Sequence, residues 1–167
     1  MLDELDRKIL AVLQSDSSLS VQEVGDHVGL SSTPCWRRIQ KLENAGYIRR
    51  RVALLDPEKL NLGVSVFIAV RTNQHNAEWV DRFRKIVTGF PEVVDFFRLS
   101  GDVDYLIRAV VPDIRAYDDL YRRLISKIDI YDVSSMFAME QIKSTTELPL
   151  VYASASHETG RRSNISV

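Results

Sequence analysis

The sequence predicts an α+β fold, in which an N-terminal winged helix-turn-helix precedes a C-terminal ferredoxin-like domain with the element order βαββαβ. Two helical apolar patterns meet at Gly29, and a strongly basic segment follows the second of them. Farther along, β-branched stretches alternate with amphipathic helical stretches, which indicates the second domain. We expect the winged helix-turn-helix at residues 1–51 and a wing or linker at 52–63. The ferredoxin-like domain is expected at 64–150, and a flexible polar tail at 151–167.

The first expected helix lies near the N-terminus and has an apolar stripe at steps of three and four residues. The polar stretch Asp16-Ser17-Ser18 ends it. We expect this helix to supply the small core on which the helix-turn-helix packs. A three-helix core is too small to be very stable alone. We therefore expect contacts with the rest of the chain or with a partner subunit to stabilise this unit. The stripe consists of Leu2, Leu5, Ile9, Val12 and Leu13.

The turn between the next two helices is predicted from the residues that cap them. Ser20, with Glu23 three residues later, forms a capping-box pattern ahead of an apolar run. Gly29 suits the left-handed residue that ends a helix. Ser31 or Ser32 can cap the helix that follows.

That following helix, about residues 32–45, is expected to enter the major groove of double-stranded DNA. Gly46 ends it, and its inward residues are expected to be Trp36, Ile39 and Leu42. From residue 37 to residue 51 there are six basic residues and one acid, although the whole chain has a net charge of −1. A local excess of this kind is what phosphate docking needs. The alternative is a solvated basic helix followed by an accidental arginine run.

The candidate DNA contacts fall into three groups. The start of the helix is placed for base edges or nearby phosphates, with Ser31, Ser32, Thr33, Trp36 and Arg37. Farther along the helix, phosphate contacts are expected from Arg38 and Lys41. A wing formed by Tyr47 to Leu55 would meet the DNA backbone through Arg49, Arg50 and Arg51. Trp36 has a second interpretation, as an apolar side chain packed beneath the helix.

The second domain is expected to place two helices on one face of a four-stranded sheet. The other face needs a cover as well, and a second copy of the same sheet provides one, so we expect an obligate homodimer. The expected elements alternate as strand, helix, strand, strand, helix, strand over residues 64–72, 77–88, 93–99, 105–111, 113–128 and 133–142.

Several classes of function have no signal in the sequence. We find no P-loop, no GxGxxG, no GxSxG and no metal-ligand spacing, so we expect neither an enzyme nor a cofactor or metal site. No apolar run is long enough to span a membrane, and the single cysteine, Cys35, fits a reducing cytoplasm. Cys35 is either a small, partly buried residue or a redox-sensing thiol whose pKa a helix N-terminus lowers.

Four blocks of the chain resemble the Lrp/AsnC, or feast–famine, family of bacterial transcription regulators: LDELDRKIL, VGLSSTPCWRRIQKLENAGYI, GDVDYL and KSTTELPL. The resemblance covers about residues 2–150. It implies a DNA-binding domain and a domain that dimerises and senses small molecules, with dimers assembling into tetramers or octamers. It also implies that an amino acid binds between dimers and alters assembly or DNA affinity. Three blocks, beginning at Ser32, Val52 and Phe137, are similar to the cysteine-responsive branch of the family, which implies cysteine as effector.

The loop from Gly101 to Tyr105 is the candidate effector region. Two carboxylates on a short loop can bind an ammonium group and neighbouring backbone N–H groups can bind a carboxylate, which together suit an amino acid. The residues alone favour a hairpin loop whose carboxylates satisfy turn amides. The resemblance reverses that preference, because it implies effector contacts at this loop. The candidate effector residues are Gly101, Asp102, Asp104, Tyr105, Ser134, Ser135 and Met136.

Two other functions stay open at this point. One is a nucleoid-organising DNA-binding protein with little sequence preference, which a specificity ratio against competitor DNA separates from a regulator. The other is a ferredoxin-like enzyme that uses Asp102 and Asp104 as a catalytic pair. An absence of salt-dependent DNA binding would favour the enzyme.

Overall fold

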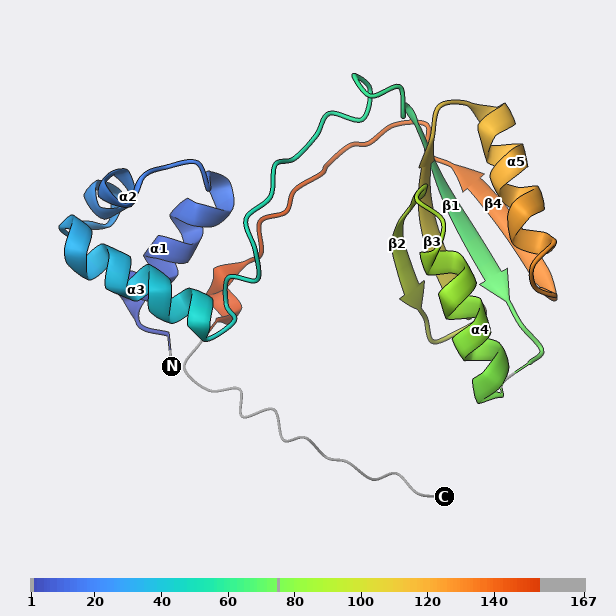
Figure 1. Cartoon of the computed structure of the whole chain (residues 1–167), viewed down its shortest axis with the longest axis horizontal. Coiled ribbons are helices and arrows are strands. Elements are labelled where there is room, and N and C mark those ends of the chain that lie inside the picture. The colour runs from blue at the N-terminus through green and yellow to red at the C-terminus, as the bar shows by residue number, and fades with distance from the viewer. Residues whose placement is uncertain (1, 75, 154–167) are drawn as a thin grey trace. The chain divides into compact units, whose positions relative to one another are not determined.

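The computed structural model describes residues 2–74 and 76–153, which form the elements labelled in Figure 1. They divide into two units. One contains the described residues up to Ala53 together with those from Lys143 onward, and the other is Leu54–Ile142. In the structure, residues 143–150, which the sequence analysis assigns to the second domain, group with the first unit. The expected tail lies outside the described residues from position 154. Within the described chain, no helix has the length and apolar character needed to cross a bilayer.

The N-terminal unit contains α1 (Glu4–Ser15), α2 (Val21–Val28) and α3 (Ser32–Asn44). The capping box before α2 is confirmed, because the Ser20 side chain accepts from the Glu23 N–H and the Glu23 side chain accepts from the Ser20 N–H. Gly29 ends α2 with φ of 74°, in the left-handed region that favours glycine. These local signals explain why the sequence predicts this turn correctly.

The three helices share one apolar core, and it corrects one expectation about α3. Cys35 is fully buried there, whereas Trp36 is 51% exposed. Residues 35, 39 and 42 are separated by four and three positions, so they lie on one helix face, and residue 36 is rotated about 100° away. Trp36 is thus not an inward residue. The buried members of the core are Ile9, Leu13, Val24, Val28, Cys35, Ile39 and Leu42.

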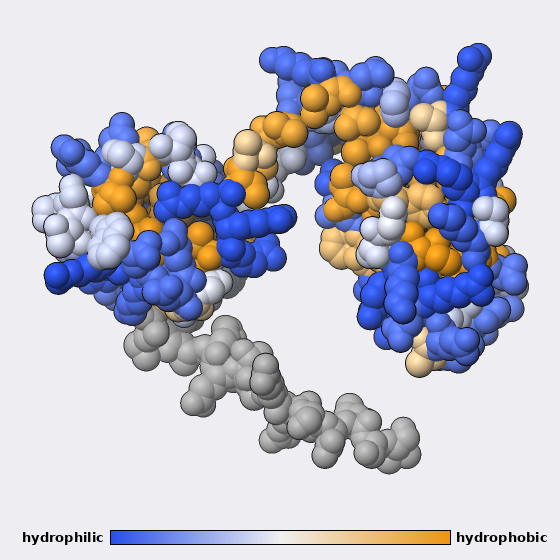
Figure 2. All heavy atoms as spheres, in the orientation of Figure 1, coloured by the Kyte–Doolittle hydropathy of each residue, from blue (hydrophilic) through white to orange (hydrophobic). Residues whose placement is uncertain are grey.

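The segment after α3 does not form the expected short strand. The backbone N–H groups of Tyr47 and Ile48 donate to the carbonyl of Leu42, and the described chain from residue 49 to residue 56 has no strand assignment. Without a partner strand the backbone cannot make a ladder. Its apolar side chains are exposed at Val52, Leu54 and Leu55. Figure 2 shows uncovered hydrophobic atoms along the extended segments that join the two units.

The second unit has the predicted βαββαβ order. Its four-stranded antiparallel sheet has the strand order β2-β3-β1-β4, and α4 and α5 pack on one face. Strand β4 ends earlier than predicted, because its partner β1 begins at Val64. The Ala138 N–H donates to the Ser65 carbonyl, and β1 has no further residue with which β4 could pair beyond this bond. The elements are β1 (Val64–Arg71), α4 (Ala77–Thr88), β2 (Val93–Arg98), β3 (Tyr105–Val111), α5 (Ile114–Ile125) and β4 (Asp132–Phe137).

Helices α4 and α5 cover one face of this sheet and leave the other face open. Val66, Ile68 and Val70 belong to the core under the helices, so the alternate residues of β1 lie on the open face. Strand register places Phe67 opposite Met136 there, and Leu106 opposite Phe97. Phe97 and Met136 are each about half exposed. The open face therefore carries apolar side chains that the helices do not cover, together with the ion pair of Arg108 and Asp95.

The chain after β4 returns to the N-terminal unit. The Gln14 side chain in α1 donates through Nε2 to the Leu148 carbonyl over 3.2 Å, and its Oε1 accepts from the Leu148 N–H over 3.0 Å. A short 3₁₀ helix, η1 (Leu150–Tyr152), follows. The C-terminal segment is consequently part of the helix-turn-helix unit.

Candidate DNA-binding surface and effector loop

The outward face of α3 carries most of the predicted base-reading residues. Ser32, Thr33, Trp36 and Arg37 are all exposed on the first turns of this helix. Ser31 is its N-cap residue but makes no side-chain cap hydrogen bond. Unpaired N–H groups and the helix dipole make such an N-terminus suitable for a phosphate. The interpretation of Trp36 as an apolar residue beneath the helix is wrong, because its ring is exposed.

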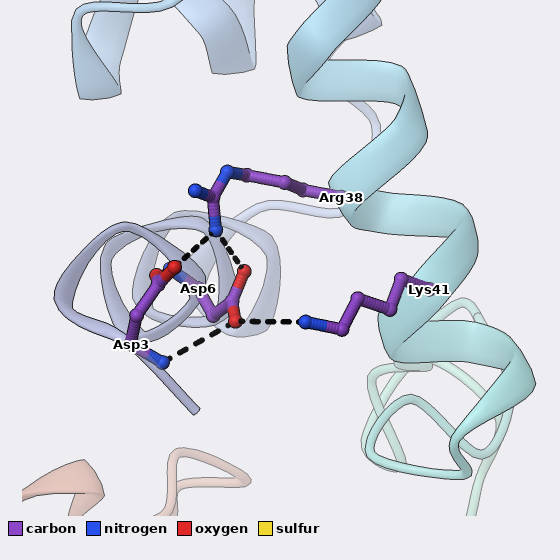
Figure 3. A network of polar contacts seen from close by, with 4 residues as sticks. All are labelled: Asp3, Asp6, Arg38 and Lys41. Carbon is purple, nitrogen blue, oxygen red and sulfur yellow. Dashed lines mark hydrogen bonds and ion pairs between the residues drawn. The ribbon is translucent and has the colours of Figure 1, made fainter. Parts of the chain in front are cut away.

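Arg38 lies differently from the prediction. Its Nη1 donates to Asp3 Oδ2 and to Asp6 Oδ1, each over 2.6 Å, and its side chain is only 28% exposed. Figure 3 shows the guanidinium between the two carboxylates, with Lys41 approaching Asp6 from another side. Lys41 Nζ lies 3.9 Å from Asp6 Oδ2, and the Lys41 side chain is 64% exposed. Arg38 therefore faces α1, whereas Lys41 keeps most of its surface open to solvent.

The same carboxylates form the N-terminal cap of α1. Asp3 Oδ1 accepts from the Asp6 N–H over 2.8 Å, and Asp6 Oδ2 accepts from the Asp3 N–H over 3.3 Å. The Asp6 N–H, and after it the Arg38 guanidinium, hold the pKa of the Asp3 carboxyl below its ordinary value. Asp6 is 1% exposed and is the only buried charged residue of the described chain. Every carboxylate oxygen of the pair is thus occupied.

The basic segment after α3 keeps two of its three arginines unpaired among the described residues. Arg51 Nη2 donates to Glu43 Oε1 over 3.2 Å, and the other oxygen of Glu43 accepts from Gln40 over 2.8 Å. Arg49 and Arg50 are exposed. Together with Arg37 they supply cations that can meet phosphates.

The effector loop is tied to the end of β1. Gly101 has φ of 121°, a backbone angle that side-chain-bearing residues rarely adopt. The Arg71 Nε donates to the Asp102 carbonyl over 2.9 Å, and the Thr72 N–H donates to Asp104 Oδ2 over 2.8 Å. The amide that Asp104 satisfies therefore lies just after β1 and not in the hairpin loop, which differs from the residue-based interpretation, and the Asp102 side chain is exposed.

Arg71 is a candidate that the sequence reasoning missed. Its Nη1 lies 3.4 Å from Asp132 Oδ2, so the guanidinium links the main chain of the loop at Asp102 to the first residue of β4. Antiparallel pairing of β1 with β3 brings this cation to the loop. The signal that could have found it is the strand register, which places the end of β1 opposite the start of β3.

The other effector candidates divide between the two faces of the sheet. Tyr105 is 6% exposed and packs against the rings of Phe83 and Phe96 under the helices, so it does not face the loop surface. Ser135 hydrogen-bonds the Tyr117 hydroxyl of α5. Ser134 and Met136 pair with alternate residues of β1 and lie on the open face. The structure therefore does not bring all seven candidates together.

Cys35 has the environment of a core residue. It is fully buried, and burial raises the pKa of its thiol. A raised pKa keeps the thiol protonated and unreactive, which opposes the redox-sensing alternative. Among the described residues, no cluster of three or more His, Cys, Asp or Glu side chains has metal-binding geometry.

A three-helix DNA-binding unit joined to a ferredoxin-like sheet defines a class of bacterial transcription regulators, and comparisons with known proteins agree. A model of the winged helix-turn-helix DNA-binding family matches residues 2–49, and one of the Lrp/AsnC ligand binding domain matches residues 65–148. The chain belongs to the Lrp/AsnC family, and it is a DNA-binding transcriptional regulator of that type.

Individual relatives span nearly the same length. The DNA-binding transcriptional activator DecR of Escherichia coli K12 is 49% identical over 151 residues, which cover 90% of this chain and 99% of the relative. The glutamate uptake regulatory protein of Zymomonas mobilis is 47% identical, covering 89% and 91%.

Solved structures show the same fold. An AsnC family transcriptional regulator from Agrobacterium tumefaciens superposes with a TM-score of 0.88 at 65% identity, covering 90% of this chain and 99% of that one. A transcriptional regulator from Neisseria meningitidis, in complex with L-Met, has a TM-score of 0.87 at 39% identity, covering 92% and 99%.

Proposed function

We propose that this protein is a sequence-specific transcription regulator that reads the major groove with α3 and whose DNA binding responds to an amino acid. The observation that carries the DNA-binding part is the outward face of α3, where Thr33, Trp36 and Arg37 are exposed together. Arg37 can bind guanine O6 and N7 with two hydrogen bonds, and Trp36 can contact a thymine methyl group. Arg49 and Arg50 supply phosphate contacts, and the mechanism requires no cofactor.

The effector site is proposed at the loop beside Arg71. The Asp102 carboxylate suits the ammonium group of an amino acid, and the Arg71 guanidinium, which bonds to the Asp102 main-chain carbonyl, suits its carboxylate. The Neisseria relative in complex with L-Met supports an amino-acid effector. Methionine is therefore the first candidate, and cysteine stays the second.

A homodimer completes this proposal. The open sheet face exposes Phe97 and Met136 beside Phe67 and Leu106, and an apolar face of this kind is stable when a like face covers it. The Phe97→Lys variant should therefore sediment as a smaller species than the unaltered protein. Ile114→Lys, at an exposed apolar residue of α5, is the matched control and should leave the assembly unchanged. An equal loss of assembly in both variants would contradict the sheet-face dimer.

The effector proposal is tested by thermal-shift titration of the purified chain against the twenty amino acids. A ligand at a hundred times its dissociation constant stabilises the native state by about 2.7 kcal/mol. Asp102→Asn should abolish the shift while preserving the loop, because Arg71 bonds to the main-chain carbonyl at this position. Asp119→Asn, at an exposed position on α5, is the control and should respond like the unaltered protein. An undiminished shift in Asp102→Asn would remove this loop from the site.

A nucleoid-organising role is the second candidate function. The chain offers unpaired cations at Arg37, Arg49 and Arg50 among its described residues, and such cations bind any DNA sequence. A regulator differs by a large preference for its own site over competitor DNA.

A further inference from the structure

The ion cluster between α1 and α3 consists of Asp3, Asp6, Arg38 and Lys41, and α3 is the helix proposed to read DNA. One guanidinium nitrogen, Arg38 Nη1, bridges both carboxylates of the α1 cap at 2.6 Å (Figure 3). Asp6 is held by the Arg38 bridge, by the Asp3 N–H and, more distantly, by Lys41. The first turn of α1 is therefore attached at one defined point of α3.

Stability alone is a weak reason for this cluster. Burying a carboxylate removes its hydration, and an ion pair in such a place is often no more stabilising than apolar residues of similar volume. Ile39 and Leu42 of α3 share one apolar core with Ile9 of α1, so apolar burial between the helices is already present. Apolar packing is non-directional, however. A charge-assisted hydrogen bond to two fixed carboxylates adds the direction that the core lacks.

We infer that Arg38 is a positioning residue that fixes the orientation of α3 on α1 through Asp3 and Asp6, and thereby determines which bases Thr33, Trp36 and Arg37 reach. Arg38 is adjacent to Arg37 in the chain, yet Arg37 is exposed and makes no ion pair with the described residues. Two consecutive arginines therefore have different tasks. Arg37 contacts DNA, and Arg38 holds the helix that presents it. This inference rests on the proposed sequence-specific DNA binding.

The test uses the full chain and two duplexes, one selected from a random pool by the unaltered protein and one with the same bases scrambled. Two quantities are measured: the ratio of the two affinities, and the slope of log affinity against log salt concentration. For Arg38→Met we expect the ratio to fall by about tenfold or more, since misplaced side chains lose base contacts. The salt slope should stay unchanged, because Arg38 does not neutralise a phosphate. Arg38→Lys should give an intermediate ratio, since an ammonium group cannot reproduce the planar guanidinium.

Arg37→Gln is the matched control, one position away on the same helix. Its salt slope should fall by about one unit, as expected for a lost phosphate or base-edge contact from a cation. Asp3→Asn and Asp6→Asn test the other side of the cluster, because a carboxylate cannot neutralise a phosphate and both carboxylates already bind Arg38. Both should lower the ratio. Asp3→Asn carries the test if Asp6→Asn does not fold, since the Asp3 side chain is half exposed.

Three results would overturn the inference. In folded Arg38→Met, a slope that falls by about one unit with an unchanged ratio would make Arg38 a phosphate ligand. Unchanged ratio and slope would make the cluster structural only. An unchanged ratio in both acidic variants would separate Asp3 and Asp6 from base reading. A ratio near one in the unaltered protein is a different result, because it overturns the proposed function as well.

Discussion

The side chain of Gln14 in α1 and the main chain of Leu148 bond to each other in both directions, although 134 positions separate them in the sequence. An amide side chain can donate and accept at once, so it mimics the pairing of a neighbouring β-strand. The C-terminal segment therefore attaches to the DNA-binding unit at α1, the helix that also contacts Arg38 through Asp6.

This pairing predicts a site-specific change in amide hydrogen exchange. Gln14→Ala should increase exchange at the Leu148 N–H, because its acceptor is gone. Gln14→Glu is the matched control, since a carboxylate still accepts this N–H, and its Leu148 amide should remain protected. Equal exchange rates at Leu148 in the unaltered protein and in Gln14→Ala would show that the attachment is absent in solution.

Replacing Gly25 in α2 by alanine should lower the stability of the protein, although this substitution normally stabilises a helix. A Cβ at this position would lie 2.5 Å from the carbonyl oxygen of Leu30. Alanine normally favours a helix over glycine, but here the contact should dominate, and Gly25→Ala should destabilise the N-terminal unit by about 1–3 kcal/mol. Gly63→Ala, where the added Cβ meets nothing within 4 Å, should change stability by less than about 0.5 kcal/mol. Circular dichroism during urea unfolding measures both, and equal midpoints for the two variants would contradict the close approach.

The Asp3 carboxyl predicts a pH dependence. Its pKa is lower in the folded protein than in the unfolded chain, so its ionised form stabilises the fold above the unfolded-state pKa of about 3.9. That contribution is lost as the pH falls through the folded-state value. Asp3→Asn should therefore be less stable than the unaltered protein at pH 7, and the difference should close in acid. Urea midpoints across this range measure it, with Asp26→Asn at an exposed position of α2 as control. A constant difference at every pH would show that the carboxylate charge does not contribute.

Trp36 predicts a separation of binding from stability. The ring is half exposed, so Trp36→Ala should change the free energy of unfolding by less than about 0.5 kcal/mol. It should weaken binding to a selected duplex if α3 reads bases with this side chain. Ile39→Ala, three positions along and buried, should instead cost about 2–5 kcal/mol of stability. The interpretation fails if Trp36→Ala destabilises the protein as much as Ile39→Ala does.

Cys35 predicts an unreactive thiol. Because the side chain is buried and burial raises the pKa of the thiol, a thiol-specific reagent at pH 7 should modify it only when the N-terminal unit opens. The rate of modification should rise steeply in urea. Rapid modification of the native protein would revive the redox-sensing alternative.

Local chemistry explains what the sequence predicts correctly. The caps at Ser20 and Gly29 involve neighbours within three or four positions, and the alternating strands and helices have their own periodicities. Ile39 and Leu42 of α3 are buried as predicted, but Cys35 takes the inward position expected for Trp36, because both are apolar and only tertiary packing decides between them.

Long-range contacts explain what the sequence does not predict. Arg38 meets Asp6 across 32 positions, and the bond between Arg71 and Asp102 spans 31, so neither partner is visible from spacing along one element. The predicted end of β4 fails for the same reason, because the length of its neighbour β1 limits the strand rather than its own apolar residues. A positive charge in a helical pattern therefore indicates a candidate for DNA contact, and tertiary structure decides which charges are already paired.

The measurement that tests the central claim most directly is the affinity ratio of the full chain for a duplex selected from a random pool over its scrambled counterpart, with and without saturating L-Met. We expect a ratio of about 10³ or more at physiological salt, and a change in affinity for the selected duplex when the amino acid is added. A ratio near one, unaffected by L-Met or by any other amino acid, would contradict a sequence-specific, amino-acid-responsive regulator and would favour the nucleoid-organising role.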